Sequence, residues 1–425
     1  MIKRILYTLL IMFPVVASAQ INTDRVMAIG RNALYFEDYV LSIQYFNQVI
    51  NAKPYLSDPY FYRGLAKINL DDFQGAESDC SEAIERNPFV VSAYQVRGLA
   101  RIQQNNFAGA IEDYTKALEF DPENIGVWHN MALCRIRQED YKGAKNDLDK
   151  LIAISPRYTK AYLMRGEVDL KQKDTLAAEK DFGKAIEIDR YDADTWASRA
   201  ILRLQQQRYK DAEADFDHAI RLSTRNSGVY INRALARYHQ NNLRGAMSDY
   251  DIALDIDPNN FIGHYNRGLL RAQVGDDNRA IQDFNFVIEM EPDNMMAIFN
   301  RGLLLDQTGD YKGAIKDYST VINEYPNFLL GYQYRAQARR KIGDVKGADA
   351  DEFKVLKAQL DKQNGVDPNK QTADNTENNK TRKKSDKNMN NYRKIVIADD
   401  SEADQRYTSD YRGRVQDKNV NITLE

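Results

Sequence analysis

The stretches "YNRGLLRAQVGDDNRAIQDFNFVIEMEPDN" (265–294) and "FNRGLLLDQTGDYKGAIKDYSTVINEYPN" (299–327) decide the fold, because the second repeats the first after 34 residues. Both place an arginine directly before a glycine inside an amphipathic segment, and both include a proline near their end. The same period extends outward in both directions. Prolines stand in this register at positions 54, 88, 122, 156, 258, 292 and 326. A fixed period of this length indicates an array of stacked repeats.

Two columns of small residues share the period. A glycine inside a helix costs up to about 1 kcal/mol relative to alanine, so its recurrence requires a packing reason. Only a small residue lets two helix backbones cross closely, and we expect the columns to mark such crossings. The columns are Gly30, Gly64, Gly98, Ala132, Gly166, Ala200, Ala234, Gly268, Gly302 and Ala336, and Ser42, Ala76, Ala110, Ala144, Ala178, Ala212, Ala246, Ala280, Ala314 and Ala348.

Apolar residues follow helical spacing twice within each period. In residues 91–124 one predicted helix carries Tyr94, Leu99 and Ile102, a turn follows, and a second helix ends before Pro122. A 34-residue helix–turn–helix with small residues twelve apart and a closing proline resembles the tetratricopeptide repeat. The resemblance covers residues 23–362 as ten tandem repeats. It implies an all-α fold, a solenoid wound as a right-handed superhelix, with a concave groove lined by the first helix of each repeat.

The chain departs from that family at one position. Where the family usually has leucine, before the first small residue, most repeats carry arginine, and sixteen residues later stands aspartate. Ile29 and Tyr45 lack both members together, which favours ion pairing within a repeat, whereas Met131 with Asp147 breaks the rule once. We predict internal ion pairs that fix helix register; a functional basic ladder is the alternative. The columns are Arg63, Arg97, Arg165, Arg199, Arg233, Arg267, Arg301 and Arg335, and Asp79, Asp113, Asp147, Asp181, Asp215, Asp249, Asp283, Asp317 and Asp351.

A second arginine column lies four residues further on, at Arg101, Arg135, Arg203, Arg237, Arg271 and Arg339. These side chains either form a basic stripe for acidic peptide termini or phosphates, or join salt bridges with the many carboxylates.

The positions that line the groove in the family carry apolar residues here. They are either core between neighbouring repeats or the wall of a groove for an extended peptide or an amphipathic helix. The predicted partner-binding residues are Phe61, Leu163, Ile231, Tyr238, Tyr265 and Phe299.

Signals for chemistry are missing from the sequence. It contains no glycine-rich phosphate loop, no G-x-S-x-G and no H-E-x-x-H, and its four histidines have no metal-site spacing. We therefore expect no enzyme, no cofactor and no metal site. The net charge of -3 gives no reason to expect nucleic acid as a partner. Cys80 and Cys134 lie two repeats apart, too far for a bridge, and are predicted to be buried free thiols.

Both ends of the chain differ from the array. Residues 1–19 have the charge, apolar run and A-x-A ending of a cleavable signal peptide, which predicts cleavage after Ala19, an exported or periplasmic protein, and no integral membrane segment after cleavage. The composition of residues 363–391 predicts a disordered linker. Residues 392–425 contain two strand-like runs, at Ile395–Ile397 and at 420–424, that either add to a partner's sheet or begin a second domain.

The predicted function is a non-catalytic protein–protein interaction scaffold in the bacterial envelope that holds a peptide or protein partner in its groove. One alternative is a structural subunit of a larger envelope assembly, such as an outer-membrane-associated complex, that uses the convex surface and the tail. A second alternative is the recruiting arm of a larger protein that continues beyond Glu425.

Overall fold

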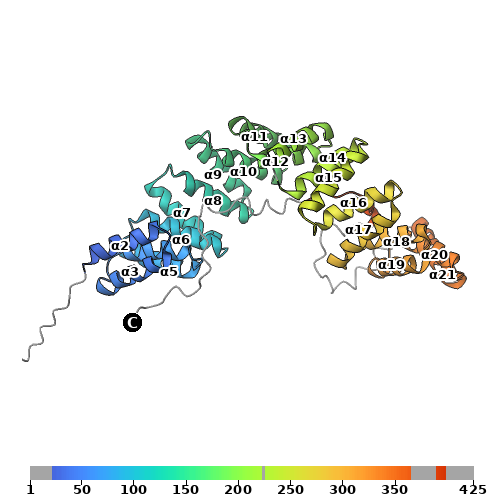
Figure 1. The fold of residues 1–425 in the computed structure, drawn as a ribbon, viewed down its shortest axis with the longest axis horizontal. Helices are drawn as coiled ribbons and strands as arrows, with labels where there is room; N and C mark the ends of the chain where they lie inside the picture. Colours follow the sequence, from blue (N-terminus) through green and yellow to red (C-terminus); the bar gives the residue numbers. More distant parts are fainter. Residues whose placement is uncertain (1–21, 223–224, 365–388, 399–425) are drawn as a thin grey trace, which may run out of the picture. The chain divides into compact units, whose positions relative to one another are not determined.

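The computed structural model describes residues 22–222, 225–364 and 389–398. Up to residue 364, this part of the chain is built of helix–turn–helix pairs, one for each of the ten predicted repeats (Figure 1). The all-α solenoid prediction is confirmed. The helices are α2 (Thr23–Tyr35), α3 (Tyr39–Ala52), α4 (Asp58–Ile68), α5 (Phe73–Arg86), α6 (Val91–Gln103), α7 (Phe107–Phe120), α8 (Ile125–Arg137), α9 (Tyr141–Ile154), α10 (Thr159–Lys171), α11 (Thr175–Ile188), α12 (Ala193–Gln205), α13 (Tyr209–Arg221), α14 (Ser227–His239), α15 (Leu243–Ile256), α16 (Phe261–Gln273), α17 (Asp277–Met290), α18 (Met295–Thr308), α19 (Tyr311–Glu324), α20 (Leu329–Lys341) and α21 (Val345–Gln363).

The helices fall into two compact units. The first holds α2–α11, and the second begins at Asp189 and holds α12–α21 together with a short 3₁₀ turn, η2 (Met389–Asn391). Within each unit, every helix packs on its partner in the pair and on the next helix along the chain. The ten repeats thus fall into two groups of five. The predicted signal peptide and the run at 420–424 lie outside the described residues.

The turn inside each repeat has a fixed design. An Asp or Asn commonly begins the second helix as its N-cap, as where Asp72 accepts a hydrogen bond from the backbone N–H of Gly75 at 2.9 Å. The residue before the cap adopts the left-handed conformation, which favours glycine. The last three repeats use glycine there and the first seven do not: the residues are Glu37, Asp71, Asn105, Glu139, Lys173, Gln207, Asn241, Gly275, Gly309 and Gly343.

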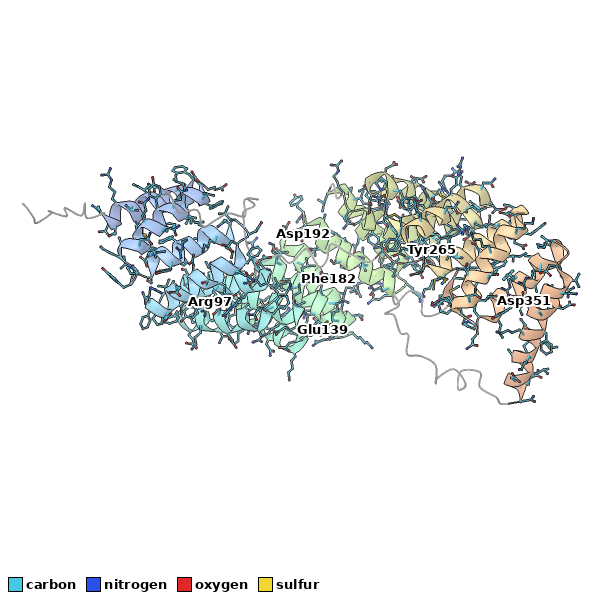
Figure 2. All side chains as sticks on the ribbon, turned by 90° about the horizontal axis from the view of Figure 1, so that it is seen from below. Arg97, Glu139, Phe182, Asp192, Tyr265 and Asp351 are labelled. Atoms are coloured by element: carbon cyan, nitrogen blue, oxygen red, sulfur yellow. The ribbon has the colours of Figure 1, made fainter. Side chains whose placement is uncertain are left out.

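The small columns mark close helix crossings, as predicted. A Cβ atom added to Gly98 would lie 2.7 Å from the ring of Tyr114, and one added to Gly166 would lie 2.5 Å from the ring of Phe182 (Figure 2). Both rings are fully buried. A small residue on the first helix therefore faces a large one on the second, and this contact forms the centre of the pair.

Candidate functional site

The predicted ion pairs are present. Every arginine of the first column hydrogen-bonds the aspartate sixteen residues later in its own repeat; in Arg233, Nε and Nη2 contact the two carboxylate oxygens of Asp249 at 3.0 and 2.6 Å. Such two-point contacts between a guanidinium and a carboxylate are among the strongest side-chain hydrogen bonds. Arg97 and Asp351, which Figure 2 labels, belong to two of these pairs. The aspartates are at most 5% exposed.

Each of these arginines except Arg199 also reaches back to the preceding repeat, which the sequence analysis did not predict. In Arg233, Nη1 donates to Asp217 at 2.7 Å, so one guanidinium joins the second helices of two neighbouring repeats. The same contact appears as Arg63–Asn47, Arg97–Ser81, Arg165–Asp149, Arg267–Asp251, Arg301–Asn285 and Arg335–Ser319. The arginine column therefore stabilises stacking between repeats as well as the crossing within each one.

The second arginine column does not form a free basic stripe. Each of its six members binds the core aspartate of its own repeat, as where Arg237 Nη1 lies 2.9 Å from an oxygen of Asp249. Their positive charges are therefore compensated by aspartates inside the fold. The salt-bridge interpretation is confirmed, and the phosphate-binding alternative loses its support.

Asp147 is the one aspartate of the column whose repeat lacks the first-column arginine, as the sequence shows. Met131 replaces its arginine, Arg135 is the cation beside it, and its Oδ2 is buried with no hydrogen-bond partner among the described residues. Desolvation by burial raises the pKa of Asp147 to about 7, against an opposing effect of Arg135. Between about pH 4 and pH 7 the folded protein therefore holds a proton that the unfolded chain has lost. The contribution of this carboxyl to stability falls as the pH rises through that window.

Asp147→Asn is expected to raise the free energy of unfolding of the first compact unit by about 1–3 kcal/mol at pH 8.5, because it replaces a buried, half-satisfied carboxylate by a neutral amide. At pH 5 the gain should disappear, since Asp147 is then protonated. Urea unfolding at both pH values measures the difference. Asp113→Asn is the matched control, and it should destabilise at pH 8.5 because Arg97 and Arg101 both bind Asp113. Equal effects of the two substitutions would contradict this account.

An asparagine column lines the first helices of repeats seven to nine, in the second compact unit. Asn232 on α14, Asn266 on α16 and Asn300 on α18 stand one position before the arginine of each repeat and are at most 5% exposed. A buried amide requires hydrogen-bond partners. We call these three residues the asparagine ladder.

Most partners of the ladder come from the backbone of residues 389–398, and Asn300 also donates to Met296 O in its own helix at 2.8 Å. The side-chain amide of Asn266 accepts from Val396 N–H at 2.9 Å and donates to Val396 O at 2.7 Å. Asn232 makes the same pair of bonds with Ala398, at 2.9 and 3.3 Å. A step of two residues along the segment thus matches a step of one repeat along the array. The segment runs in the opposite direction to the order of the repeats. At the third step, Asn300 donates to Tyr392 O at 2.6 Å.

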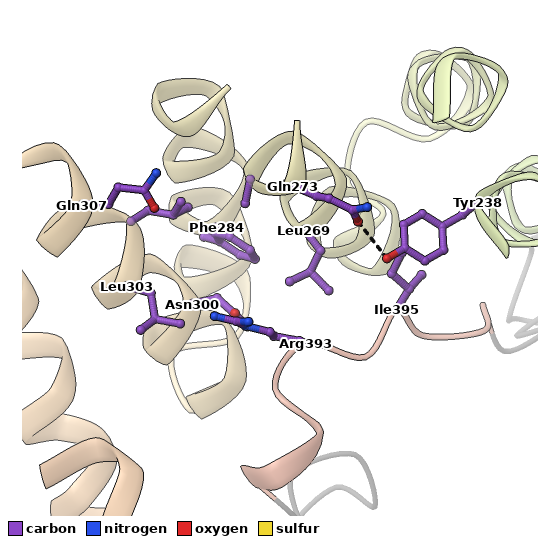
Figure 3. A pocket seen from close by; sticks show the side chains of 11 residues that line it. Tyr238, Leu269, Gln273, Phe284, Asn300, Leu303, Gln307, Arg393 and Ile395 are labelled. Carbon is purple, nitrogen blue, oxygen red and sulfur yellow. Dashed lines mark hydrogen bonds between the residues drawn. The ribbon is translucent and has the colours of Figure 1, made fainter. Parts of the chain in front are cut away.

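Apolar contacts accompany these bonds. The ring of Tyr392 packs edge-on against Phe299 with centroids 4.7 Å apart, and the hydroxyl of Tyr265 donates to Tyr392 O at 2.6 Å. Ile395 is buried in a cluster with Leu235, and Ala398 in one with Ile231. Beside the segment remains a cavity of about 420 Å³ whose lining includes Tyr238, Leu269 and Leu303 (Figure 3).

The predicted binding residues separate into two groups. Ile231, Tyr238, Tyr265 and Phe299 lie in the second compact unit, around residues 389–398 and the adjoining cavity. Phe61 and Leu163 lie in the first compact unit, where Phe61 packs against the apolar core of repeats two and three and Leu163 is 5% exposed. The structure thus assembles four of the six residues at one place.

The tail differs from its prediction. Residues 389–391, assigned to a disordered linker, form η2, and Met389 is buried at 4% exposure. Residues 395–397, predicted as a strand, have no regular secondary structure, and the backbone bonds of Val396 go to the side chain of Asn266. The physical reason is that an amide side chain offers both a hydrogen-bond donor and an acceptor on one edge, as a neighbouring strand would. Residues 399–425 lie outside the described residues.

The ladder was not predicted from the sequence, although its signal was visible there. The dipeptide Asn-Arg recurs at 232–233, 266–267 and 300–301, inside helices whose faces are otherwise apolar. A polar residue repeated at a core position predicts either a partner or a ligand. The earlier repeats hold Ala28, Tyr62, Val96, Asn130, Met164 and Ser198 at this position.

Models of the tetratricopeptide repeat match residues 98–134, 125–158, 159–192, 198–261 and 265–327. Together the matches cover about half of the sequence, and the chain belongs to the tetratricopeptide repeat family. Proteins of this family bind protein or peptide partners and are typically non-catalytic. A comparison with the curated proteins finds no match.

Solved structures with similar folds include a tetratricopeptide repeat protein from Parabacteroides merdae, 21% identical over 59% of this chain and 98% of that one, with a TM-score of 0.46. Another is the C-terminal part of a TPR repeat-containing protein from Cytophaga hutchinsonii, 18% identical over 55% and 96% of the two chains, with a TM-score of 0.47. A third, YrrB, is described as a TPR protein with an unusual peptide-binding site and is 18% identical over 43% and 95%, with a TM-score of 0.40.

Two further observations concern the described residues. None of their helices combines the length and the apolar character needed to cross a bilayer. No group of three or more His, Cys, Asp or Glu side chains among them is placed to hold a metal ion.

Proposed function

We propose that this protein is a non-catalytic interaction scaffold that binds an extended peptide segment along the asparagine ladder of its second compact unit. One observation carries the proposal: Asn232 and Asn266 each hold both backbone polar groups of one residue in an extended segment. A bound peptide must exchange its hydrogen bonds with water for bonds to the protein, and the ladder supplies them.

The chemistry of the ladder explains what it recognises. An amide side chain pairs with a peptide N–H and C=O whatever the residue is, much as an added strand pairs with a sheet edge. Because the three amides are buried, water competes poorly for them. Selectivity then depends on the side chains that enter the neighbouring apolar surface, where Tyr392 meets Phe299 and Ile395 meets Leu235.

The occupied ladder supports this function over the two alternatives drawn from the sequence. In a structural subunit that uses only its convex surface, nothing would require three buried amides to face one extended segment. A recruiting arm of a larger protein would use the ladder in the same way, so that reading differs only in what lies beyond Glu425.

A titration with a labelled peptide tests the function. The full chain carrying Tyr392→Ser and Ile395→Asp, which weakens the tail's own contacts, should bind a fluorescent peptide of residues 389–398, MNNYRKIVIA, with a dissociation constant of about 100 µM by anisotropy. Adding Asn266→Ala should weaken binding about tenfold or more, because two hydrogen bonds of about 1 kcal/mol each are lost.

The matched control for this titration is Asn130→Ala. Asn130 occupies the same position of its repeat but belongs to the first compact unit, so its replacement should leave the affinity unchanged. If the tail variant bound no peptide, or if Asn266→Ala bound as well as its parent, the ladder would not be a binding site.

We also propose an exported, periplasmic location, with outer-membrane-associated complexes among the candidate partners. The support is the signal-peptide pattern of residues 1–19. Intact-mass measurement of the protein recovered from the envelope fraction of a bacterial host should give a chain that begins at Gln20. A chain that keeps residues 1–19 would contradict this location.

A further inference from the structure

The segment on the ladder belongs to the chain itself. Residues 389–398 follow α21 after residues 365–388, a stretch of 24 residues that can span at most about 80 Å. In the second compact unit, the backbone of this segment forms hydrogen bonds with the side-chain amides of Asn232, Asn266 and Asn300. The binding surface is therefore already occupied.

Most side chains of the segment are covered by this surface. Met389, Ile395 and Ala398 are each at most 8% exposed, and Tyr392, Val396 and Ile397 are half-buried. Burial of side chains such as Ile395 stabilises the bound segment, because it removes apolar surface from water. The contacts lie on three successive first helices, and a random surface contact would not follow the repeat in this way.

The segment leaves the surface beside Arg393 unfilled. Arg393 and Lys394 are exposed, and Arg393 borders the 420 Å³ cavity, where it lies beside Asn300 (Figure 3). Leu269, Leu303 and Leu304 supply apolar wall to that cavity. A charged side chain gains little from such a wall, whereas an apolar one in its place would be buried there.

We propose that residues 389–398 are an intramolecular competitor that occupies the asparagine ladder until an external peptide displaces them. The inference rests on the proposed function of the ladder. The external ligand is an extended segment with an aromatic residue at the position of Tyr392, an aliphatic one at Ile395 and a small one at Ala398. At the position of Arg393 it carries an apolar residue, which fills the cavity and lets it outcompete the tail.

The tether makes the competition measurable. A connection of 24 residues gives the tail an effective concentration on the order of 1 mM at the ladder. A tail whose intrinsic dissociation constant is about 100 µM would then weaken the apparent affinity of any external peptide about tenfold. A more tightly bound tail would weaken it further.

The experiment compares full-length chains by anisotropy with the labelled peptide of residues 389–398. The variant carrying Tyr392→Ser and Ile395→Asp is expected to bind about tenfold more tightly than the wild-type chain. Lys394→Ala, at an exposed tail position, is the matched control and should bind like the wild type. A second peptide with leucine in place of Arg393 is expected to bind the tail variant about tenfold more tightly than the first. Circular dichroism verifies that all chains keep their helical content.

The outcomes separate the two proposals. Equal affinity of the wild-type chain and the tail variant would overturn the competitor while leaving the ladder a peptide site; no binding to either would overturn the ladder itself. A wild-type dimer that becomes a monomer in the tail variant would show the tail on a second copy and overturn the intramolecular assignment. Hydrogen exchange gives an independent readout, since the amides of Val396 and Ala398 should exchange slowly in the wild type and faster once the leucine peptide is added.

Discussion

Replacing Arg301 by methionine is expected to lower the free energy of unfolding of the second compact unit by about 3–5 kcal/mol, the range for breaking one side of a buried ion pair. Asp317 is 3% exposed, and Arg301 is the one cation paired with it in the described part of the chain. Leu305 stands where most repeats carry their second arginine. The substitution therefore leaves a buried carboxylate without a counter-charge. Urea unfolding followed by circular dichroism measures the loss, and hydrogen exchange should localise it to α18 and α19.

A second substitution tests the cause. In the double variant with Arg301→Met and Asp317→Asn, the uncompensated charge is gone, and most of the lost stability should return, leaving a deficit of about 1–2 kcal/mol. The ninth repeat is well suited to this double-mutant cycle, because the other hydrogen-bond acceptor of Arg301 is the neutral Asn285. A double variant as unstable as Arg301→Met alone would show that the arginine acts through its packing and not through the pair.

Cys134 should react with a thiol reagent about 1,000-fold more slowly in the folded protein than in urea at pH 8. Burial raises the pKa of Cys134 to about 12, and only the thiolate is nucleophilic. Burial likewise raises the pKa of Cys80 above its usual range. Both side chains are free thiols with no exposed surface, as predicted from their separation by two repeats.

The time course of labelling with a chromogenic disulfide measures this protection. Because the folded thiol keeps its proton above pH 9, where the unfolded thiol loses it, stability should fall as the pH rises from about 9 toward 12. Cys80→Ser and Cys134→Ser chains assign the signal to one residue each. Rapid labelling of either thiol under native conditions would contradict the burial.

The fold could be predicted because its signals repeat. The prolines, the small columns and the Arg–Asp columns each occur many times at one spacing, and pairing within a repeat followed from the joint absence at Ile29 and Tyr45. The bond from each arginine to the preceding repeat could not be derived in this way, because its acceptor varies among Asn, Ser and Asp and leaves no column to recognise.

The site was only half predictable. Ile231, Tyr265 and Phe299 were predicted because apolar residues at groove positions stand out, and they lie around residues 389–398. The ladder was missed because three asparagines within apolar helices were not treated as a column. Its occupant could not be found from periodicity, since residues 389–398 belong to no repeat. Their place on α14, α16 and α18 depends on long-range contacts with partners up to 166 positions away.

Under the proposed function, the amide pairs on Val396 and Ala398 also bear on how freely the peptide ligands can change over evolution. A site that binds the main chain places no constraint on most side chains of its ligand, because every residue except proline presents the same N–H and C=O. Only a few anchor positions, such as those of Tyr392 and Ile395, carry sequence information. Unrelated proteins could therefore gain or lose affinity for this scaffold by one or two substitutions in an unstructured stretch. The set of its partners could thus change faster in evolution than the sequence of the scaffold itself.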